Sequence, residues 1–344
     1  MIGRPASVPE DWVRPRTDWR ESLNRMVHLK RSLLLLAAIL AIQFIQPDGL
    51  FAANRRAKAK PKPKAKAGLT AKSALVMNMT TGEILFSKNP DEPIAPASLT
   101  KILSLYLIYE ALGEGRVRTS DIVYVSSNVS RVDGSRMRIR PGSQIALGDL
   151  MKGMAVVSAN DASVAAAEYI GGDVDEFVRR MNVKALELGM TGSHFGNPSG
   201  LREEGQVTTA RDILTLSCAY INRFPQSLQM HSLPVFEYGR RVRSNTNHLL
   251  ETNHYVDGLK TGHVAGSGYH LVVTARKNNS RVVAIVLGSR SSGARFREAR
   301  NLLEQGFKAV QAPVSAKRMA GVEVMRAGSG MESGRKSTGG SGDS

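Results

Sequence analysis

The chain has 344 residues, with 47 Lys and Arg against 30 Asp and Glu, which gives a net charge of +17. Strong positive charge is one mark of nucleic-acid-binding proteins. No basic motif interleaved with aromatic residues accompanies it here, so we expect no nucleic-acid partner. The single cysteine, Cys218, excludes an intramolecular disulfide. The histidines lack the HExxH spacing of a zinc peptidase, so neither a metal nor a cofactor is predicted.

The N-terminal part of the chain is typical of an exported protein. Residues 32–45 form a largely apolar run that follows two basic residues, and Ala52-Ala53 offers small residues for cleavage. This pattern predicts a signal peptide within residues 1–53, and a protein of the periplasm or of the extracytoplasmic face of the cell membrane. The alternative is that the apolar run is kept as an anchor. Because a compact charged region follows Met26, we expect translation to start there.

Two further segments lie outside the predicted folded domain. Residues 54–68 carry seven basic residues and no acidic one, so self-repulsion and proline predict an extended linker. An anionic membrane surface or acidic wall polymers suit its charge, and a solvated spacer without a partner is the other interpretation. Residues 313–344 are rich in Gly and Ser and predict a flexible tail. The 244 residues from 69 to 312 are enough for a catalytic domain with a full core.

Within residues 69–312, the predicted elements are first strands, then mainly helices, and then strands again before a final helix. Short runs bounded by turn residues predict strands near both ends, and helical periodicity predicts helices between them. The expected strands are 73–79, 83–87, a strand that carries residues 260–262, 269–276 and 281–288, and the expected helices are 98–112, 147–157, 161–170, 173–189, 209–221 and 294–308. This order predicts an α+β fold, in which a roughly five-stranded antiparallel sheet from both chain ends packs against a helical cluster.

The first motif that carries chemistry is Ser98-Leu99-Thr100-Lys101, at the start of an apolar stretch that predicts a buried helix. A spacing of three residues puts Ser98 and Lys101 on the same helix face, one turn apart. A serine hydroxyl is a weak nucleophile until a base takes its proton. A lysine is such a base only if burial and nearby positive charge lower its pKa. The ordinary alternative is a serine N-cap followed by a solvated lysine.

Two more motifs follow in the chain. Ser158-Ala159-Asn160 lies between two helical patterns, where a hydroxyl and an amide can project into a cleft, although alone it also fits a helix cap. Lys260-Thr261-Gly262 precedes a strong strand, and its glycine permits the close approach of a substrate or of the Ser98 helix. Alone it fits an ordinary strand end. The three motifs in this order are the signature of serine acyl-transfer enzymes that act on D-alanyl peptides and β-lactams.

With these motifs the chain resembles the D-alanyl-D-alanine carboxypeptidase family, the low-molecular-weight penicillin-binding proteins. The resemblance covers roughly residues 69–312 and includes Pro96–Lys101, Val156–Ala162, Asn197–Leu201, Thr209–Asp212 and Asp257–His263. It implies a β-lactamase/transpeptidase-like fold. It also implies a penicillin-binding enzyme that removes the terminal D-Ala from peptidoglycan stem peptides and has β-lactams as inhibitors.

The resemblance also implies a role for each residue of the site. Ser98 is expected to be the nucleophile, Lys101 its base and Ser158 a proton relay. The backbone N–H groups of Ser98 and His263 are expected to form the oxyanion hole. The substrate is expected to be bound by Asn160, Lys260, Thr261, Gly262, His263 and Arg295.

One departure from the family leaves substrate preference open. Thr246 stands before Asn247-His248-Leu249-Leu250, where members of the family often carry an arginine. Two other functions also stay open: a D,D-endopeptidase that cuts peptidoglycan cross-bridges by the same mechanism, and a non-catalytic wall-binding protein with a retained fold. The stretch Gly192–Leu201 has no acidic residue to activate water on an acyl ester, so we expect a poor β-lactamase.

Overall fold

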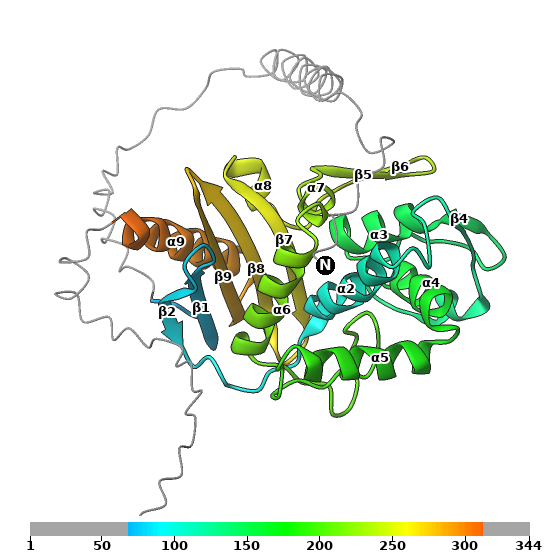
Figure 1. Cartoon of the computed structure of the whole chain (residues 1–344), viewed down its shortest axis with the longest axis horizontal. Helices are drawn as coiled ribbons and strands as arrows, with labels where there is room; N and C mark the ends of the chain where they lie inside the picture. Colours follow the sequence, from blue (N-terminus) through cyan, green and yellow to red (C-terminus); the bar gives the residue numbers. More distant parts are fainter. Residues whose placement is uncertain (1–67, 312–344) are drawn as a thin grey trace, which may run out of the picture. The chain divides into compact units, whose positions relative to one another are not determined.

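The computed structural model describes residues 68–311 and places a five-stranded antiparallel sheet beside a cluster of helices (Figure 1). The strands follow the order β2-β1-β9-β8-β7. They are β1 (Ser73–Asn78), β2 (Glu83–Lys88), β7 (Val256–Val264), β8 (Gly268–Lys277) and β9 (Ser280–Ser289). The sheet therefore combines strands from both ends of the described chain, which confirms the predicted α+β arrangement.

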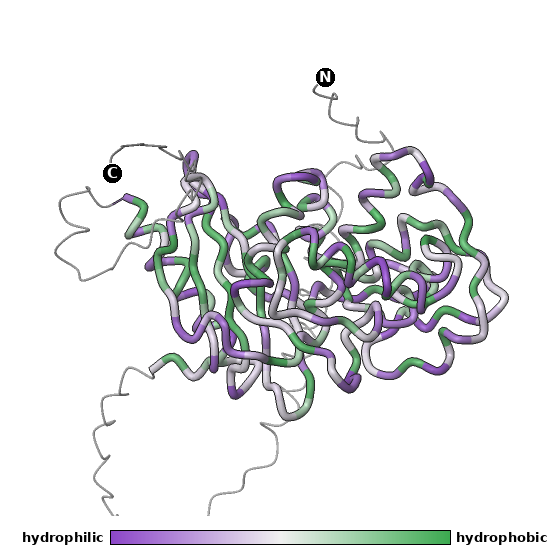
Figure 2. The backbone as a smooth tube through the Cα atoms, turned by 60° about the horizontal axis from the view of Figure 1, so that its bottom comes forward, coloured by the Kyte–Doolittle hydropathy of each residue, from purple (hydrophilic) through white to green (hydrophobic). Residues whose placement is uncertain are grey.

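The pairing of β1 with β9 joins the two ends of the domain. Leu75 lies opposite Ile285 and Val76 opposite Ala284. Because side chains alternate between the faces of a sheet, one set faces α9 (Ser292–Gln311) and the other faces α6 (Ala210–Arg223). Hydrophobic residues run along these strands (Figure 2). The sheet is therefore covered by helices on both faces.

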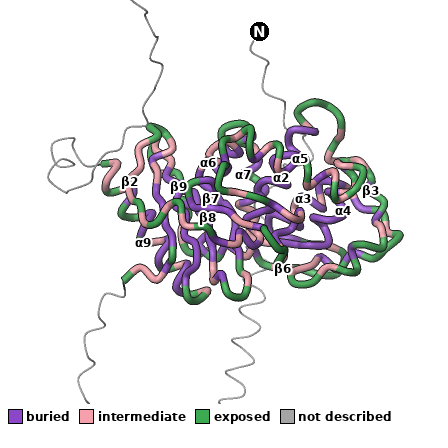
Figure 3. The backbone as a smooth tube through the Cα atoms, turned by 90° about the horizontal axis from the view of Figure 1, so that it is seen from below, coloured by how far each residue is buried: buried purple, intermediate pink, exposed green. Residues whose placement is uncertain are grey.

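The central helix of the cluster is α2 (Thr100–Gly113), in which every residue up to Ala111 is buried. Its tube lies among the buried segments in Figure 3. A helix that is apolar all round is buried on all sides, as predicted. The predicted start of this helix at Ser98 is wrong, however, because Ala97–Leu99 form the 3-10 turn η3. Ala97 adopts a left-handed φ of 49°, so the chain enters the helix through a tight turn.

The other predicted helices are present, and none of their ends is shifted by more than three residues. They are α3 (Leu147–Val156), α4 (Asn160–Gly171), α5 (Val174–Glu187), α6 and α9. The sequence did not predict the shorter elements, since three to five residues hold too little periodicity to mark a strand or a helix. These are β3 (Ile122–Tyr124), η4 (Ser127–Arg131), β4 (Gln144–Ala146), α7 (Ser227–His231), β5 (Val235–Tyr238), β6 (Arg241–Ser244) and α8 (Leu249–Thr252).

Several predictions concern residues that the structure does not describe. The predicted signal segment, residues 1–53, lies outside the described part of the chain, as do the tail, residues 313–344, and the basic linker except Gly68. Within residues 68–311, no helix combines the length and the apolar character that a membrane span requires.

Candidate active site

A cavity of about 310 Å³ brings most of the predicted site residues together. Its wall is built by η3, the start of α4, the end of β7 and the loop that precedes Arg202. The predicted residues that line it are Ser98, Ser158, Asn160, Thr261, Gly262, His263 and Arg295. The other two, Lys101 and Lys260, are buried beside it and hydrogen-bonded to Ser98 and Ser158.

The amine of Lys101 lies against the hydroxyl of Ser98. Lys101 Nζ is 3.0 Å from Ser98 Oγ, 2.7 Å from Asn160 Oδ1 and 2.6 Å from the carbonyl oxygen of Ser199. The last two oxygens can only accept hydrogen bonds. A neutral amine has two N–H donors and one lone pair, so those two acceptors take its hydrogens. The lone pair is then left for the proton of the Ser98 hydroxyl.

The environment of Lys101 favours this neutral amine. The side chain has no exposed surface. Burial holds the pKa of Lys101 well below its usual value of 10.5, the positive charge of Lys260 lowers the pKa further, and Asp161 opposes the shift. Burial disfavours the charged form because the protein interior solvates an ammonium group less well than water does. Lys101 thus has both the position and the lowered basicity that a general base requires.

A second lysine–serine pair, Lys260 and Ser158, lies in the wall of the cavity. Lys260 Nζ donates to Ser158 Oγ at 2.8 Å. Burial and, to a smaller degree, the charge of Arg295 lower the pKa of Lys260 to about 7. Ser158 adopts a left-handed φ of 61°, which is costly for a residue other than glycine and is characteristic of functional sites. The surrounding contacts hold this hydroxyl in the wall of the cavity.

Asn160 and Asp161, the first residues of α4, tie the site to a distant loop. Asn160 Oδ1 accepts from Lys101 and so fixes the direction of the amine, while its Nδ2 donates to the carbonyl of Asp133 at 2.6 Å. The buried carboxylate of Asp161 accepts the successive N–H groups of Met137, Arg138 and Ile139, at 2.9, 2.7 and 3.1 Å. The sequence did not reveal this role of Asp161, because its partners lie more than twenty residues away.

The strand β7 presents its end to the cavity. Thr261 Oγ1 donates to Thr246 Oγ1 at 2.9 Å, and both residues line the cavity. A Cβ on Gly262 would lie 3.3 Å from the Cβ of Ala97, so the strand packs closely against η3. The ring of His263 stacks on Tyr269 at 4.1 Å between centroids. The backbone of β7 therefore runs beside the turn that carries Ser98.

Arg295, in the first turns of α9, reaches the same cavity. Its Nη1 donates to the carbonyl of Gly262 at 3.0 Å, and its guanidinium lies 5.6 Å from the ring of Tyr269. Within the described part of the chain, Nε of Arg295 has no hydrogen-bond partner. Burial lowers the pKa of Arg295 to about 10. Arg290, its neighbour in the sequence, is exposed and does not line the cavity.

Three residues to which the sequence assigned no role in the site also shape it. The carbonyl of Ser199 binds Lys101, Gly200 lines the cavity, and Thr246 binds Thr261. Gly200 has a φ of 77°, and a Cβ there would lie 1.8 Å from the carbonyl oxygen of Ala97, so only glycine fits. The Asn-Pro and Gly residues of this loop are turn signals, but they do not indicate which atom the turn presents to Lys101.

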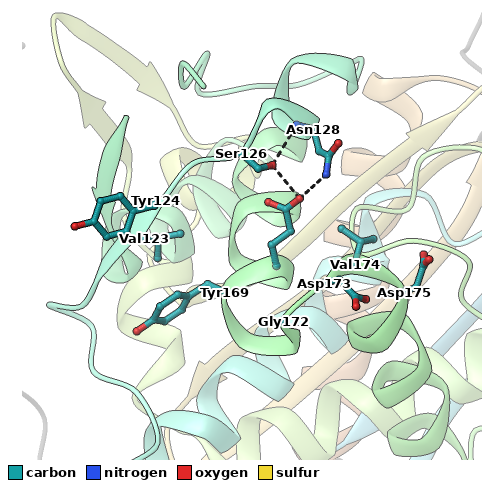
Figure 4. Close-up of a pocket in the computed structure, with 10 residues that line it drawn as sticks. Val123, Tyr124, Ser126, Asn128, Tyr169, Gly172, Asp173, Val174 and Asp175 are labelled. Atoms are coloured by element: carbon teal, nitrogen blue, oxygen red, sulfur yellow. Dashed lines mark hydrogen bonds between the residues drawn. The ribbon is translucent and has the colours of Figure 1, made fainter. Parts of the chain in front are cut away.

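A larger cavity of about 640 Å³ lies elsewhere, along β3, η4 and the end of α4 (Figure 4). There Glu168 Oε1 accepts from Ser126 Oγ at 2.9 Å and from Asn128 Nδ2 at 2.8 Å. Tyr124 and Tyr169 line one side of it. None of the predicted site residues takes part, and no buried lysine lines it. We therefore place the chemistry in the smaller cavity.

Three features define the transpeptidase-like class of serine enzymes: a sheet with strands from both chain ends, a helical cluster, and a serine–lysine pair between them. Within this class the match is more specific. A family model described as D-alanyl-D-alanine carboxypeptidase matches residues 57–291. The chain belongs to this family, as the motifs predicted.

Relatives and solved structures agree with this assignment. The D-alanyl-D-alanine carboxypeptidase DacF of Bacillus subtilis is 37% identical over 243 residues, which cover 69% of this chain and 62% of the relative. The chain thus spans about three fifths of that relative's length. Penicillin-binding protein 5 of Haemophilus influenzae is similar in structure, with a TM-score of 0.68 at 34% identity over 70% of this chain and 71% of that one.

A further structure comes from a complex with a β-lactam. Penicillin-binding protein D2 of Listeria monocytogenes, in its ampicillin-bound form, has a TM-score of 0.64 at 30% identity. The match covers 70% of this chain and 98% of that chain. The match therefore extends over nearly the whole of that solved chain.

Proposed function

We propose that this chain is a serine-type D-alanyl-D-alanine carboxypeptidase, which removes the terminal D-Ala from peptidoglycan stem peptides through an acyl-enzyme on Ser98. The observation that supports this most directly is the buried amine of Lys101, 3.0 Å from Ser98 Oγ. Membership of the family supports the substrate class. The predicted export segment supports a site of action in the periplasm or on the extracytoplasmic face of the membrane.

Acylation begins with a proton transfer inside the Ser98–Lys101 pair. The Ser98 hydroxyl gives its proton to the neutral amine of Lys101 as Oγ bonds to the carbonyl carbon of the penultimate D-Ala. The carbonyl oxygen becomes an oxyanion, which the backbone N–H groups of Ser98 and His263 stabilise. The C–N bond then breaks. The leaving D-Ala takes a proton that originates from Lys101 and passes through the hydroxyl of Ser158, which Lys260 holds in place.

Deacylation reverses these roles. A water molecule attacks the ester carbonyl and gives its proton to the neutral base, and the bond to Ser98 Oγ breaks as the oxygen regains a proton. The products are the shortened peptide, with a new carboxylate, and the free hydroxyl of Ser98. Ser98, Lys101 and Ser158 are already positioned by the fold, so little reorganisation is needed.

The groups that hold the substrate follow from the lining of the cavity. The hydroxyl of Thr261 and the guanidinium of Arg295 bind the terminal carboxylate of the substrate. Asn160 binds a substrate amide through the N–H of Nδ2 that Asp133 does not use. Thr246 holds the hydroxyl of Thr261 from behind, in the position where relatives often have an arginine. Because Thr246 is smaller than an arginine and uncharged, Arg202 and Arg295 are the arginines of the described lining.

The reaction with β-lactams stops at the acyl-enzyme. Among the described residues that line the cavity there is no Asp or Glu, so no carboxylate stands ready to activate water on a penicilloyl ester. Penicillin is therefore an inhibitor and a poor substrate. The intact mass of the full chain, followed over time after mixing with benzylpenicillin, tests this. We expect a covalent adduct that lasts for minutes or longer and is absent from Ser98→Ala. Undiminished labelling of Ser98→Ala would sink the assignment.

A second experiment identifies the substrate bond. Digestion of purified cell wall by the protein is followed by analysis of the released products. We expect free D-Ala from uncross-linked stem peptides. Release of cross-bridge fragments without free D-Ala would instead identify a D,D-endopeptidase. If no product appeared and penicillin did not label the protein, it would be a non-catalytic wall-binding protein.

A further inference from the structure

Besides Arg295, one arginine lines the active-site cavity, and five more lie on two segments that are hydrogen-bonded to each other and, through Arg243, to the cavity residue Ser135. Of these five, three belong to the loop between η4 and β4 and two to strand β6. We call this set the arginine rim; its members are Arg136, Arg138, Arg140, Arg202, Arg241 and Arg243. Four of them are exposed, while Arg136 and Arg243 are half-buried.

The loop part of the rim is fixed to the catalytic motif. In the stretch Arg136-Met137-Arg138-Ile139-Arg140, the two apolar residues are buried, and the arginines alternate with them. Asp161, directly after Asn160, accepts the N–H groups of the three middle residues. Because one buried carboxylate holds three successive backbone groups, the arginine side chains are displayed from a backbone of defined geometry.

The strand part of the rim is joined to this loop. Arg243 Nη1 donates to the carbonyl of Arg136 at 2.6 Å, and its Nη2 donates to Ser135 Oγ at 3.3 Å. Ser135 lines the cavity, so Arg243 lies one contact away from it. Arg241 is two residues earlier on the same strand and therefore lies on the same face. The end of this hairpin is exposed in Figure 3.

The nearby carboxylate of Asp161 is taken up by three backbone N–H groups of the rim loop, and no guanidinium of the rim pairs with it. Within residues 68–311, none of its six guanidinium groups forms an ion pair with an Asp or Glu. The acidic residues nearest in sequence are Asp133, Glu203, Glu204 and Glu237, all of them exposed. Uncompensated like charges repel and produce a strong positive potential, which attracts an anionic ligand. The rim thus has the chemistry of a carboxylate-binding surface.

The size of the cavity indicates which ligand meets this surface. A cavity of about 310 Å³ is at the lower limit of small-molecule sites, so it holds little more than the terminal dipeptide. The rest of the substrate lies outside, across the mouth. We propose that the arginine rim binds side-chain or α-carboxylates of the substrate peptide upstream of the scissile bond. This inference rests on the proposed function, and it makes the free carboxylate form of the stem peptide a better substrate than its carboxamide form.

The test uses two synthetic peptides that end in D-Ala-D-Ala and differ in one upstream group, a free carboxylate or the corresponding carboxamide. The full chain should cleave the carboxylate peptide with a kcat/KM roughly three- to tenfold higher, the effect of one or two exposed ion pairs. This ratio should fall to about one in Arg140→Glu/Arg241→Glu. High salt should also abolish it, because at about 1 M the screening length is near 3 Å.

Arg276→Glu is the matched control for the single rim variants Arg140→Glu and Arg241→Glu, which are measured beside the double variant. Arg276 is an exposed strand arginine at the end of β8 away from His263, so the same charge reversal there should leave the ratio unchanged. Diacetyl-L-Lys-D-Ala-D-Ala, whose single charge is the C-terminal carboxylate, reports basal activity in every variant. The inference would be overturned by a wild-type ratio of one, or by a ratio that survives in the rim variant. Cleavage of diacetyl-L-Lys-D-Ala-D-Ala in the same experiment would still uphold the proposed function. A third outcome would also overturn the inference: the peptide ratio is one, and the protein binds phosphatidylglycerol vesicles only when the rim is intact. The rim would then be a membrane contact. If no peptide is cleaved, the proposed function itself fails, and this inference with it.

Discussion

The sheet is buried in two different ways, against α9 on one face and at the β7 edge beside the active site. On the α9 face the buried cluster is apolar: Val76, Val273, Val282, Ala284, Val286, Ala299, Leu302 and Leu303. At the β7 edge, Lys101 and Lys260 are buried just as completely. Burying apolar surface stabilises the fold, whereas burying an amine costs stability and lowers its pKa. Equal burial thus supplies stability in one region and reactivity in the other.

Replacing the base should produce the largest effect. Lys101→Ala removes the lone pair that faces Ser98 Oγ, so the rate of penicillin acylation should fall about 10²–10⁴-fold. Stopped-flow or mass-based acylation kinetics measure this rate. Circular dichroism should show that the variant remains folded, because the lost group is one whose burial was unfavourable. An acylation rate equal to that of the wild type would mean that another group activates Ser98.

A substitution on the α9 face should lower stability and leave the chemistry unchanged, which is the reverse of the effect at Lys101. Leu303→Ala leaves a cavity between α9 and the sheet and should lower the free energy of unfolding by about 2–5 kcal/mol. Acylation per folded molecule should not change, since the residue touches no site group. Urea denaturation and active-site titration measure the two quantities. The matched control is Leu186→Ala on α5, where the residue is 67% exposed and the expected change is within about 0.5 kcal/mol. Equal losses in both variants would refute the comparison.

The buried lysine of β7 should make stability depend on pH. The pKa of Lys260 is about 7 in the folded protein and near 10.5 in the unfolded chain. Between these values the unfolded chain binds a proton that the folded protein lacks, so the contribution of Lys260 to stability rises with pH. The free energy of unfolding of the wild type, relative to Lys260→Met, should therefore increase across this window. Parallel pH profiles for the two proteins would show that the amine is not desolvated.

The smallest effect is expected at Thr246. Thr246→Ala removes the hydroxyl that accepts from Thr261 Oγ1, so the kcat/KM for a D-Ala-D-Ala peptide should fall roughly three- to tenfold, the effect of one net hydrogen bond. The melting temperature should stay the same because the position opens onto the cavity. Thr191→Ala, in an exposed loop, serves as the control. No change in kcat/KM would mean that Thr261 is positioned by its strand alone.

Much of this organisation was predictable, and the misses share a cause. The Ser98–Lys101 pair spans three residues, so the helical repeat alone indicated that the two meet. The long strands and helices carried clear periodicity. The turn at Ala97, the carbonyl of Ser199 and the loop held by Asp161 did not, because each depends on contacts between distant segments. The strands β5 and β6 were not predicted because four residues are too few to show a periodic pattern. The position of Arg243, on β6, was therefore not predicted either.

The sequence by itself determined which reactive groups exist, their order along the chain and the family to which the chain belongs. Only the tertiary structure decided how those groups behave. Lys260 meets Ser158 across 102 residues, and Lys101 meets Asn160 across 59. A lysine acquires a lowered pKa through the desolvation and the neighbouring charges that such distant segments impose. Both arise from packing in three dimensions, which no local pattern of residues records.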